Sequence, residues 1–281
     1  MSPQELIFLK KEFANHGSPK AIILDVRGTI LDPTNDWPVN HELLKNICAC
    51  IEKGISIALI TGCSLKTVIN LILEQHKEIT CGTNNESIGK LYLYTGTGCQ
   101  AFLVGENRKV EPLENYEILT LNKDVEGRLI KIIHNFEKKT GVKGHVEIRQ
   151  GQINYYCQAS RSERNLIANQ LRVLLRSGGY DYLHLIVPTA KSVIDISLST
   201  KKFAAMDFIH RANLKNPEKI VFISDSLQID GGDISILSVS SNIRAYHVGP
   251  KDSPIASGVT PVAGGPKATS IILLYCCESL I

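Results

Sequence analysis

Three short apolar segments of this 281-residue sequence end in polar residues that could do chemistry. They are AIILD (21–25), ending in Asp25, ISIALIT (55–61), ending in Thr61, and KIVFISD (219–225), ending in Asp225. If the segments are parallel strands, their ends meet at one edge of a sheet, where ligands usually bind. Two carboxylates at one edge favour a cation, and Mg²⁺ prefers oxygen ligands shared with a phosphate. The pattern therefore predicts a magnesium and phosphate site.

Other polar residues follow these strand ends closely. Gly28 and Thr29 come after Asp25, Asp233 follows Asp225 across SLQIDGGD, and Lys202 lies in the helical pattern KKFAAM. Each has a plainer interpretation, because a carboxylate can simply cap a strand and a lysine can be solvated at a helix start. Lys201 competes with its neighbour for the same role. The combination of these residues, rather than any one of them, favours a catalytic site.

The elements that would position these residues alternate between strand and helix. Helical patterns at 40–54, 64–75 and 201–212 separate the buried strands, which predicts a doubly wound α/β sheet. The middle of the chain differs, with hairpin patterns at 91–104 and 145–159. We therefore expect a Rossmann-like core formed by residues 1–85 and 189–281, with an α+β cap inserted at residues 86–188. Helices are expected in this cap at 124–139 and 161–177.

The amino-acid composition limits which partners and which cellular compartment are expected for this protein. The 31 Lys and Arg residues nearly balance 28 Asp and Glu residues, so nucleic acid is not expected as a partner. No apolar run is long enough to span a bilayer, and the first residues lack the apolar core of a signal peptide. The 8 cysteines show no paired CxxC spacing, which is typical of reduced thiols in a cytoplasmic protein. A homodimer stays open as an alternative to a monomer.

The ordered motifs resemble the four signatures of the haloacid dehalogenase (HAD) superfamily. DVRGTI is similar to the first signature, ITG at 60–62 to the second, Lys202 to the third and SDSLQIDGGD to the fourth. The eight-residue step between Asp225 and Asp233 resembles the phosphomannomutase and Cof-type sugar-phosphatase branch. HVEIRQGQIN and RSERN resemble its α+β (C2B-type) cap. The resemblance implies a cap that closes over a phosphorylated sugar.

The resemblance also implies a role for each matched residue. Asp25 would attack phosphorus and carry a transient aspartyl phosphate, and Lys202 and Thr61 would hold the phosphoryl oxygens. Mg²⁺ would be held by Asp25, the backbone carbonyl of Arg27, Asp225 and Asp233. Residues expected to contact the substrate are Gly28, Thr29, Gly62, Arg149 and Asn154.

Arg27 departs from the pattern, because related enzymes usually have an aspartate there as the general acid. Arginine stays charged at neutral pH and cannot donate that proton, although it can stabilise negative charge. Three hypotheses follow. The chain is a Mg²⁺-dependent phosphatase without the usual acid, a phosphohexomutase that uses another acid, or a catalytically weak relative that binds sugar phosphates or a protein.

Overall fold

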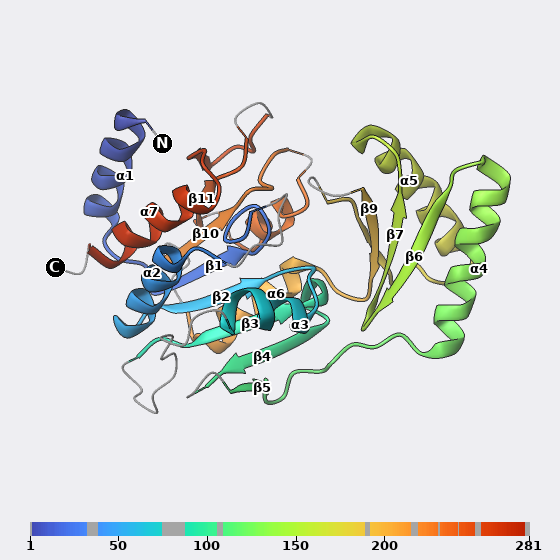
Figure 1. The fold of residues 1–281 in the computed structure, drawn as a ribbon, viewed down its shortest axis with the longest axis horizontal. Coiled ribbons are helices and arrows are strands. Elements are labelled where there is room, and N and C mark those ends of the chain that lie inside the picture. Colours follow the sequence, from blue (N-terminus) through green and yellow to red (C-terminus); the bar gives the residue numbers. More distant parts are fainter. Residues whose placement is uncertain are drawn as a thin grey trace.

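The computed structural model of the protein contains two β-sheets, each of which forms the centre of a separate unit (Figure 1). The structure describes residues 2–32, 39–74, 88–105, 109–188, 192–214, 219–229, 231–240, 242–250 and 254–278. An eight-stranded sheet forms the larger unit, and a four-stranded sheet with two long helices forms the smaller one.

The larger sheet has the order β12-β11-β10-β1-β2-β3-β4-β5. Strands β12 to β3 pair in parallel, whereas β4 and β5 are antiparallel additions at one edge. Its strands are β1 (Ala21–Asp25), β2 (Ser56–Ile60), β3 (Leu91–Thr95), β4 (Gln100–Val104), β5 (Val110–Pro112), β10 (Ile220–Ser224), β11 (Arg244–His247) and β12 (Val259–Pro261). The predicted doubly wound α/β core is therefore confirmed.

Helices cover both faces of this sheet, which explains why β1 is apolar throughout. Ile22 and Leu24 pack on one face, and Ala21 and Ile23 pack on the other. The first face carries α1 (Pro3–His16), α2 (His41–Glu52), α3 (Leu65–Val68), η1 (Ile69–Leu73) and α7 (Pro266–Glu278). The second carries α6 (Lys201–Arg211) and η5 (Ile234–Val239), and η2 (Gly96–Gly98) joins β3 to β4. Burial on both faces is the expected property of a central parallel strand.

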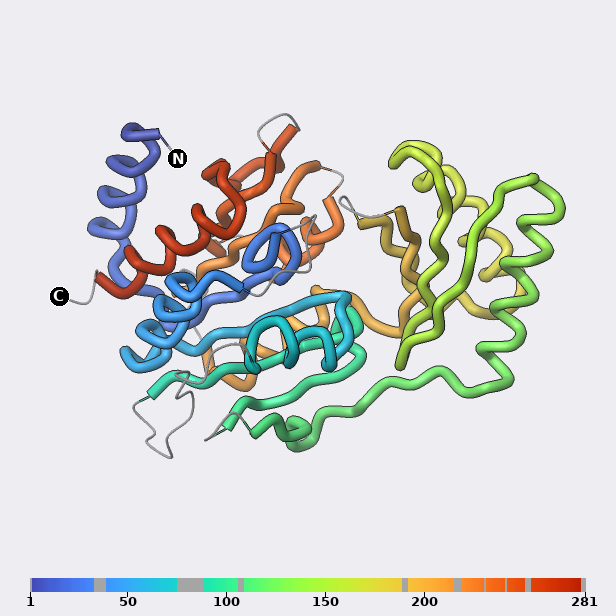
Figure 2. The backbone as a smooth tube through the Cα atoms, in the orientation of Figure 1, coloured from blue at the N-terminus to red at the C-terminus, as the bar shows by residue number. Residues whose placement is uncertain are grey.

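The smaller unit, which we call the cap, is a four-stranded antiparallel sheet backed by two helices. Its strand order is β6-β7-β9-β8. Its elements are α4 (Lys123–Thr140), β6 (Gly144–Arg149), β7 (Gln152–Cys157), α5 (Arg161–Ser177), β8 (His184–Ile186) and β9 (Val193–Ser197). Apolar side chains of alternate strand residues pack against the helices, as Ile153, Tyr155, Ile194 and Ile196 do. The chain passes to the cap after β5 and returns just before α6 (Figure 2).

The expected boundaries of the cap, residues 86–188, are wrong at both ends. The hairpin at 91–104 forms β3 and β4, and β3 pairs in parallel with β2 of the core. At the other end, β9 pairs with β7 and β8, so it belongs to the cap sheet. A hairpin pattern shows that two strands pair with each other but not which sheet they join, and this caused the first error.

Two predictions from composition can be compared with the structure. The seven cysteines of the described residues are free thiols, as expected. Within the described ranges, no helix has both the length and the apolar composition that crossing a membrane requires.

Candidate active site

Asp25 and Asp225 meet at the carboxyl ends of two neighbouring strands, as the sequence predicted. Asp25 is the last residue of β1, and Asp225 follows β10, which pairs with β1 in parallel. The Thr29 hydroxyl accepts a hydrogen bond of 3.0 Å from the Asp225 backbone N–H. Gly28 lets the two segments approach, since a Cβ atom placed on it would lie 2.0 Å from Asp225 Oδ2. Gly28 and Thr29 therefore position the second carboxylate.

The lysine of the site is Lys201, and the prediction of Lys202 is wrong by one residue. The Lys201 ammonium lies 2.5 Å from Asp25 Oδ1 and 2.7 Å from Asp233 Oδ1. Lys201 is the first residue of α6, whose N-cap is Thr200. Successive side chains on a helix point about 100° apart, so Lys202 cannot share this direction. The half-buried Lys202 lies one step around the helix.

Asp233 is held in place by the side chain of Ser224. The Ser224 hydroxyl donates a 2.7 Å hydrogen bond to Asp233 Oδ2. The same hydroxyl accepts a hydrogen bond from the Ser226 backbone N–H at 2.9 Å. Both oxygens of Asp233 thus have fixed partners, and one of them is Lys201.

Burial and mutual repulsion make this cluster electrostatically costly. Burial is the main cause that raises the pKa of Asp25 to about 6, although the Lys201 charge opposes it. Burial, with the charges of Asp25 and Asp233, raises the pKa of Asp225 to about 8. Burial alone would lower the pKa of Lys201, but the charges of Asp233 and Asp25 outweigh it and raise that pKa. Ionisation of all three carboxyl groups beside this one ammonium would therefore leave an excess of buried negative charge.

This excess of negative charge fits a divalent cation. No group of three acidic, histidine or cysteine side chains in the described part of the chain has metal-binding geometry. Asp225 and Asp25 nevertheless lie within hydrogen-bonding reach of each other. Mg²⁺ is usually held by one or two carboxylates, with waters and substrate phosphate completing its shell. The donor set therefore fits Mg²⁺ bound by Asp25 and Asp225, while Asp233 serves to anchor Lys201.

Thr61 and Gly62 form the neighbouring strand end and line the same cavity as Asp25. The Thr61 hydroxyl accepts a 3.1 Å hydrogen bond from the Cys63 backbone N–H. The short helix α3 begins just beyond, with Ser64 as its N-cap. The turn after β2 thus places Thr61, Gly62 and Cys63 in the wall of the cavity that contains the carboxylates.

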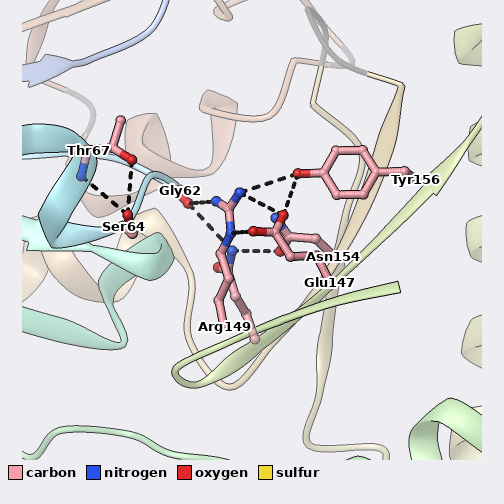
Figure 3. A network of polar contacts seen from close by, with 8 residues as sticks. Gly62, Ser64, Thr67, Glu147, Arg149, Asn154 and Tyr156 are labelled. Atoms are coloured by element: carbon pink, nitrogen blue, oxygen red, sulfur yellow. Dashed lines mark hydrogen bonds and ion pairs between the residues drawn. The ribbon is translucent and has the colours of Figure 1, made fainter. Parts of the chain in front are cut away.

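Arg149 of the cap reaches this turn, as Figure 3 shows. It donates to the Gly62 carbonyl oxygen at 3.3 Å and forms a two-point ion pair with Glu147. Arg149 also donates to the Tyr156 hydroxyl at 3.3 Å. Gln152 donates to the Gly62 carbonyl at 3.4 Å and to Asn154 Oδ1 at 2.7 Å. The β6–β7 hairpin is therefore docked against the core beside the carboxylates.

Core and cap together enclose a cavity of about 810 Å³, within the range of small-molecule sites. Every predicted site residue except Gly28, Thr29 and Lys202 lines it, and Lys201 takes the place of Lys202. Those that line it are Asp25, Arg27, Thr61, Gly62, Arg149, Asn154, Asp225 and Asp233. Arg27 thus faces the same space as Asp25.

Sequence reasoning missed a buried carboxylate in the cavity. Asp195 lies in the middle of β9, is only 7% exposed and lines the cavity from the cap side. The signal was present in the strand VIDIS, where one charge interrupts an apolar run.

The fold resembles those of known phosphatases, although the sequence does not. No protein-family model matches the sequence, and a comparison with curated proteins found no match. The structure is similar to IMP-nucleotidase of Plasmodium falciparum (TM-score 0.67, 12% identity, 98% of this chain and 70% of that chain). It is also similar to trehalose-6-phosphate phosphatase of Aspergillus fumigatus (TM-score 0.61, 12% identity, 99% and 98%). The C-terminal domain of that phosphatase from C. albicans gives a TM-score of 0.63 at 14% identity, over 100% and 98% of the two chains.

These similarities confirm the fold class predicted from the sequence. The chain has a doubly wound, Rossmann-like α/β core with an α+β cap. At identities of 12–14% the likeness concerns the fold alone.

Proposed function

We propose that this protein is a Mg²⁺-dependent phosphohydrolase that acts on a small phosphorylated molecule, with sugar phosphates as the expected class. The observation that carries this proposal is Lys201, whose ammonium bridges Asp25 and Asp233 at the floor of the cavity. A structural ion pair would not need a third carboxylate, Asp225, in the same buried place. A site for phosphoryl transfer, by contrast, needs a nucleophile, a cation and a metal ligand in the same place.

In the proposed reaction, Asp25 attacks the phosphorus atom and forms an aspartyl phosphate, which water then hydrolyses. Lys201 keeps Asp25 ionised and neutralises the phosphoryl oxygens. The Thr61 hydroxyl and the N–H groups of the following turn hold the other oxygens. Asp25 and Asp225 would hold Mg²⁺, which would supply Lewis-acid neutralisation of the negative charge at the site. Arg27 would act as a fixed cation at the cavity wall.

The cap would recognise the rest of the substrate. Its polar face brings Arg149 and Asn154 to the cavity, and both can bond hydroxyl or phosphate oxygens. These groups and the fourth-signature spacing support the phosphomannomutase and Cof-type branch. A mutase must transfer protons in both directions, so Arg27 weighs more heavily against that activity than against hydrolysis.

A phosphatase screen tests the proposal. The purified chain should hydrolyse p-nitrophenyl phosphate and members of a sugar-phosphate panel with Mg²⁺, and a chelator should abolish turnover. Isomerisation of a sugar 1-phosphate with a bisphosphate activator would instead identify a mutase. Saturable binding of sugar phosphates without turnover would identify the weak relative and contradict the proposal.

A further inference from the structure

Arg27 cannot donate the proton that the leaving oxygen needs in the proposed reaction, and the cap contains a carboxyl group that could do so. Strand β9 alternates between two environments. Ile194 and Ile196 pack in the apolar interior of the cap, whereas Val193 and Asp195 face the cavity. Asp195 is 7% exposed. A carboxyl group on a buried sheet face costs free energy, and this one lies on the face of β9 that lines the cavity.

Asp195 lies beside the strand end that would hold the phosphate. Its Oδ2 atom would be 3.8 Å from a Cβ atom placed on Gly62, the residue after Thr61. The docked hairpin fixes this approach, because Arg149 and Gln152 both donate to the Gly62 carbonyl. The β-sheet register places Asp195 opposite Asn154 of β7. The cap backbone therefore holds Asp195 at the phosphate end of the cavity.

The direction of attack places the leaving group on the cap side. In phosphoryl transfer, the attacking and leaving oxygens lie roughly in line with phosphorus. Asp25 attacks from the end of β1 in the core, so the leaving oxygen points away from the core sheet. Asp195 reaches the cavity from the cap sheet.

We propose that Asp195 is the general acid and base of this enzyme, in place of the residue at position 27. This rests on the proposed phosphohydrolase function. As the bond from Asp25 to phosphorus forms, the bond to the leaving oxygen breaks, and that oxygen takes the proton of Asp195. In the second step the Asp195 carboxylate takes a proton from water, whose oxygen attacks phosphorus. The bond to Asp25 breaks, phosphate leaves, and Asp195 is protonated again.

The dependence of turnover on the leaving group tests this role. The wild type and Asp195→Asn are compared on p-nitrophenyl phosphate, phenyl phosphate and glucose 6-phosphate with Mg²⁺. For phenyl phosphate and glucose 6-phosphate, which have poor leaving groups, Asp195→Asn should lower kcat by about 10²-fold or more, the usual contribution of a general acid to the rate. For p-nitrophenyl phosphate the change should stay within about threefold, because that leaving group needs little protonation. Asp124→Asn, at the exposed start of α4, removes the same charge outside the cavity and should change neither value.

Any other outcome would contradict either the role of Asp195 or the proposed function. An equal loss on all three substrates, or no loss on any, would overturn the role of Asp195 while hydrolysis by Asp25 stands. Absence of turnover in the wild type would overturn the proposed function itself, and the inference with it. If Asp195→Asn does not fold, Asp195→Ser replaces it. Added formate should then restore turnover of phenyl phosphate but not change that of p-nitrophenyl phosphate, and failure to restore it would also overturn the role.

Discussion

At the scale of single residues, the position of the ammonium group determines which of the two adjacent lysines, Lys201 or Lys202, is needed for catalysis. Lys201→Ala should lower kcat by about 10²-fold or more, because it removes the cation nearest the nucleophile. Lys202→Ala is the matched control and should stay within about threefold of the wild type. The measurement is steady-state hydrolysis of p-nitrophenyl phosphate by both variants. Equal losses in the two variants would contradict the assignment of Lys201.

The residue types of this site could be predicted from the sequence, but their directions could not. Asp25, Thr61 and Asp225 lie at the ends of apolar strands, and that pattern was enough to predict that they meet at one sheet edge. Lys201 and Lys202 are chemically identical, and only the start of α6 decides which one faces Asp25. Asp195 was missed because its role depends on which face of β9 lines the cavity, and the local sequence does not specify that face.

At the scale of elements, the turn after β1 depends on glycine at position 28. Its φ of +79° disfavours other residues, and an added Cβ atom would collide with the Asp225 carboxylate. Gly258 has the same φ but nothing within 4 Å of its added Cβ. Gly258→Ala should therefore cost only the backbone strain, about 1–2 kcal/mol. Gly28→Ala should cost roughly 1–3 kcal/mol more through overpacking.

Chemical denaturation of both variants measures this difference in the free energy of unfolding. Gly28→Ala should also weaken Mg²⁺ binding, because Asp225 must move, whereas Gly258→Ala should not. Equal destabilisation of the two variants would show that the close approach of Gly28 and Asp225 is absent.

The carboxylate cluster predicts an unusual dependence of stability on pH. The folded-state pKa values of Asp25 and Asp225 are raised to about 6 and about 8. Between the unfolded and folded pKa values the folded protein holds protons that the unfolded chain has lost, so stability falls as pH rises. We expect the Tm of the metal-free protein to fall as pH rises through this window toward about 8.

Asp225→Asn and added Mg²⁺ should both oppose this loss. At pH 8 without metal, Asp225→Asn should raise Tm by at least about 2 °C, which corresponds to roughly 1 kcal/mol. Mg²⁺ should raise the Tm of the wild type and have much less effect on this variant. Thermal unfolding followed by circular dichroism checks both statements, and a wild-type Tm that rises over the same pH range would contradict them.

Sheet membership was predictable only in part at this scale. Buried runs such as AIILD identified the core strands, because a strand covered on both faces must be apolar throughout. The hairpin at 91–104 carries no residue that distinguishes the core sheet from the cap sheet. Its pairing with β2 is a tertiary contact, so the local pattern could not assign it.

At the scale of the whole molecule, the cap and the core each supply part of the cavity. Arg149 links them by donating to the Gly62 carbonyl while Glu147 holds its guanidinium. Arg149→Ala should raise KM for glucose 6-phosphate by about tenfold, roughly 1.4 kcal/mol, through the loss of one charged hydrogen bond. The kcat for p-nitrophenyl phosphate should change much less, because the core holds the phosphoryl group. A loss confined to kcat would contradict this division of roles.

The central claim is that Asp25 carries the phosphoryl group during turnover. Wild-type protein mixed with p-nitrophenyl phosphate and Mg²⁺ is quenched rapidly in acid, digested and analysed by mass spectrometry. We predict one added phosphoryl group on the peptide that contains Asp25. We predict neither label nor turnover in Asp25→Asn, whose circular dichroism should match that of the wild type. A phosphoryl group on another residue, or full turnover by Asp25→Asn, would contradict the covalent mechanism and the role of this cluster.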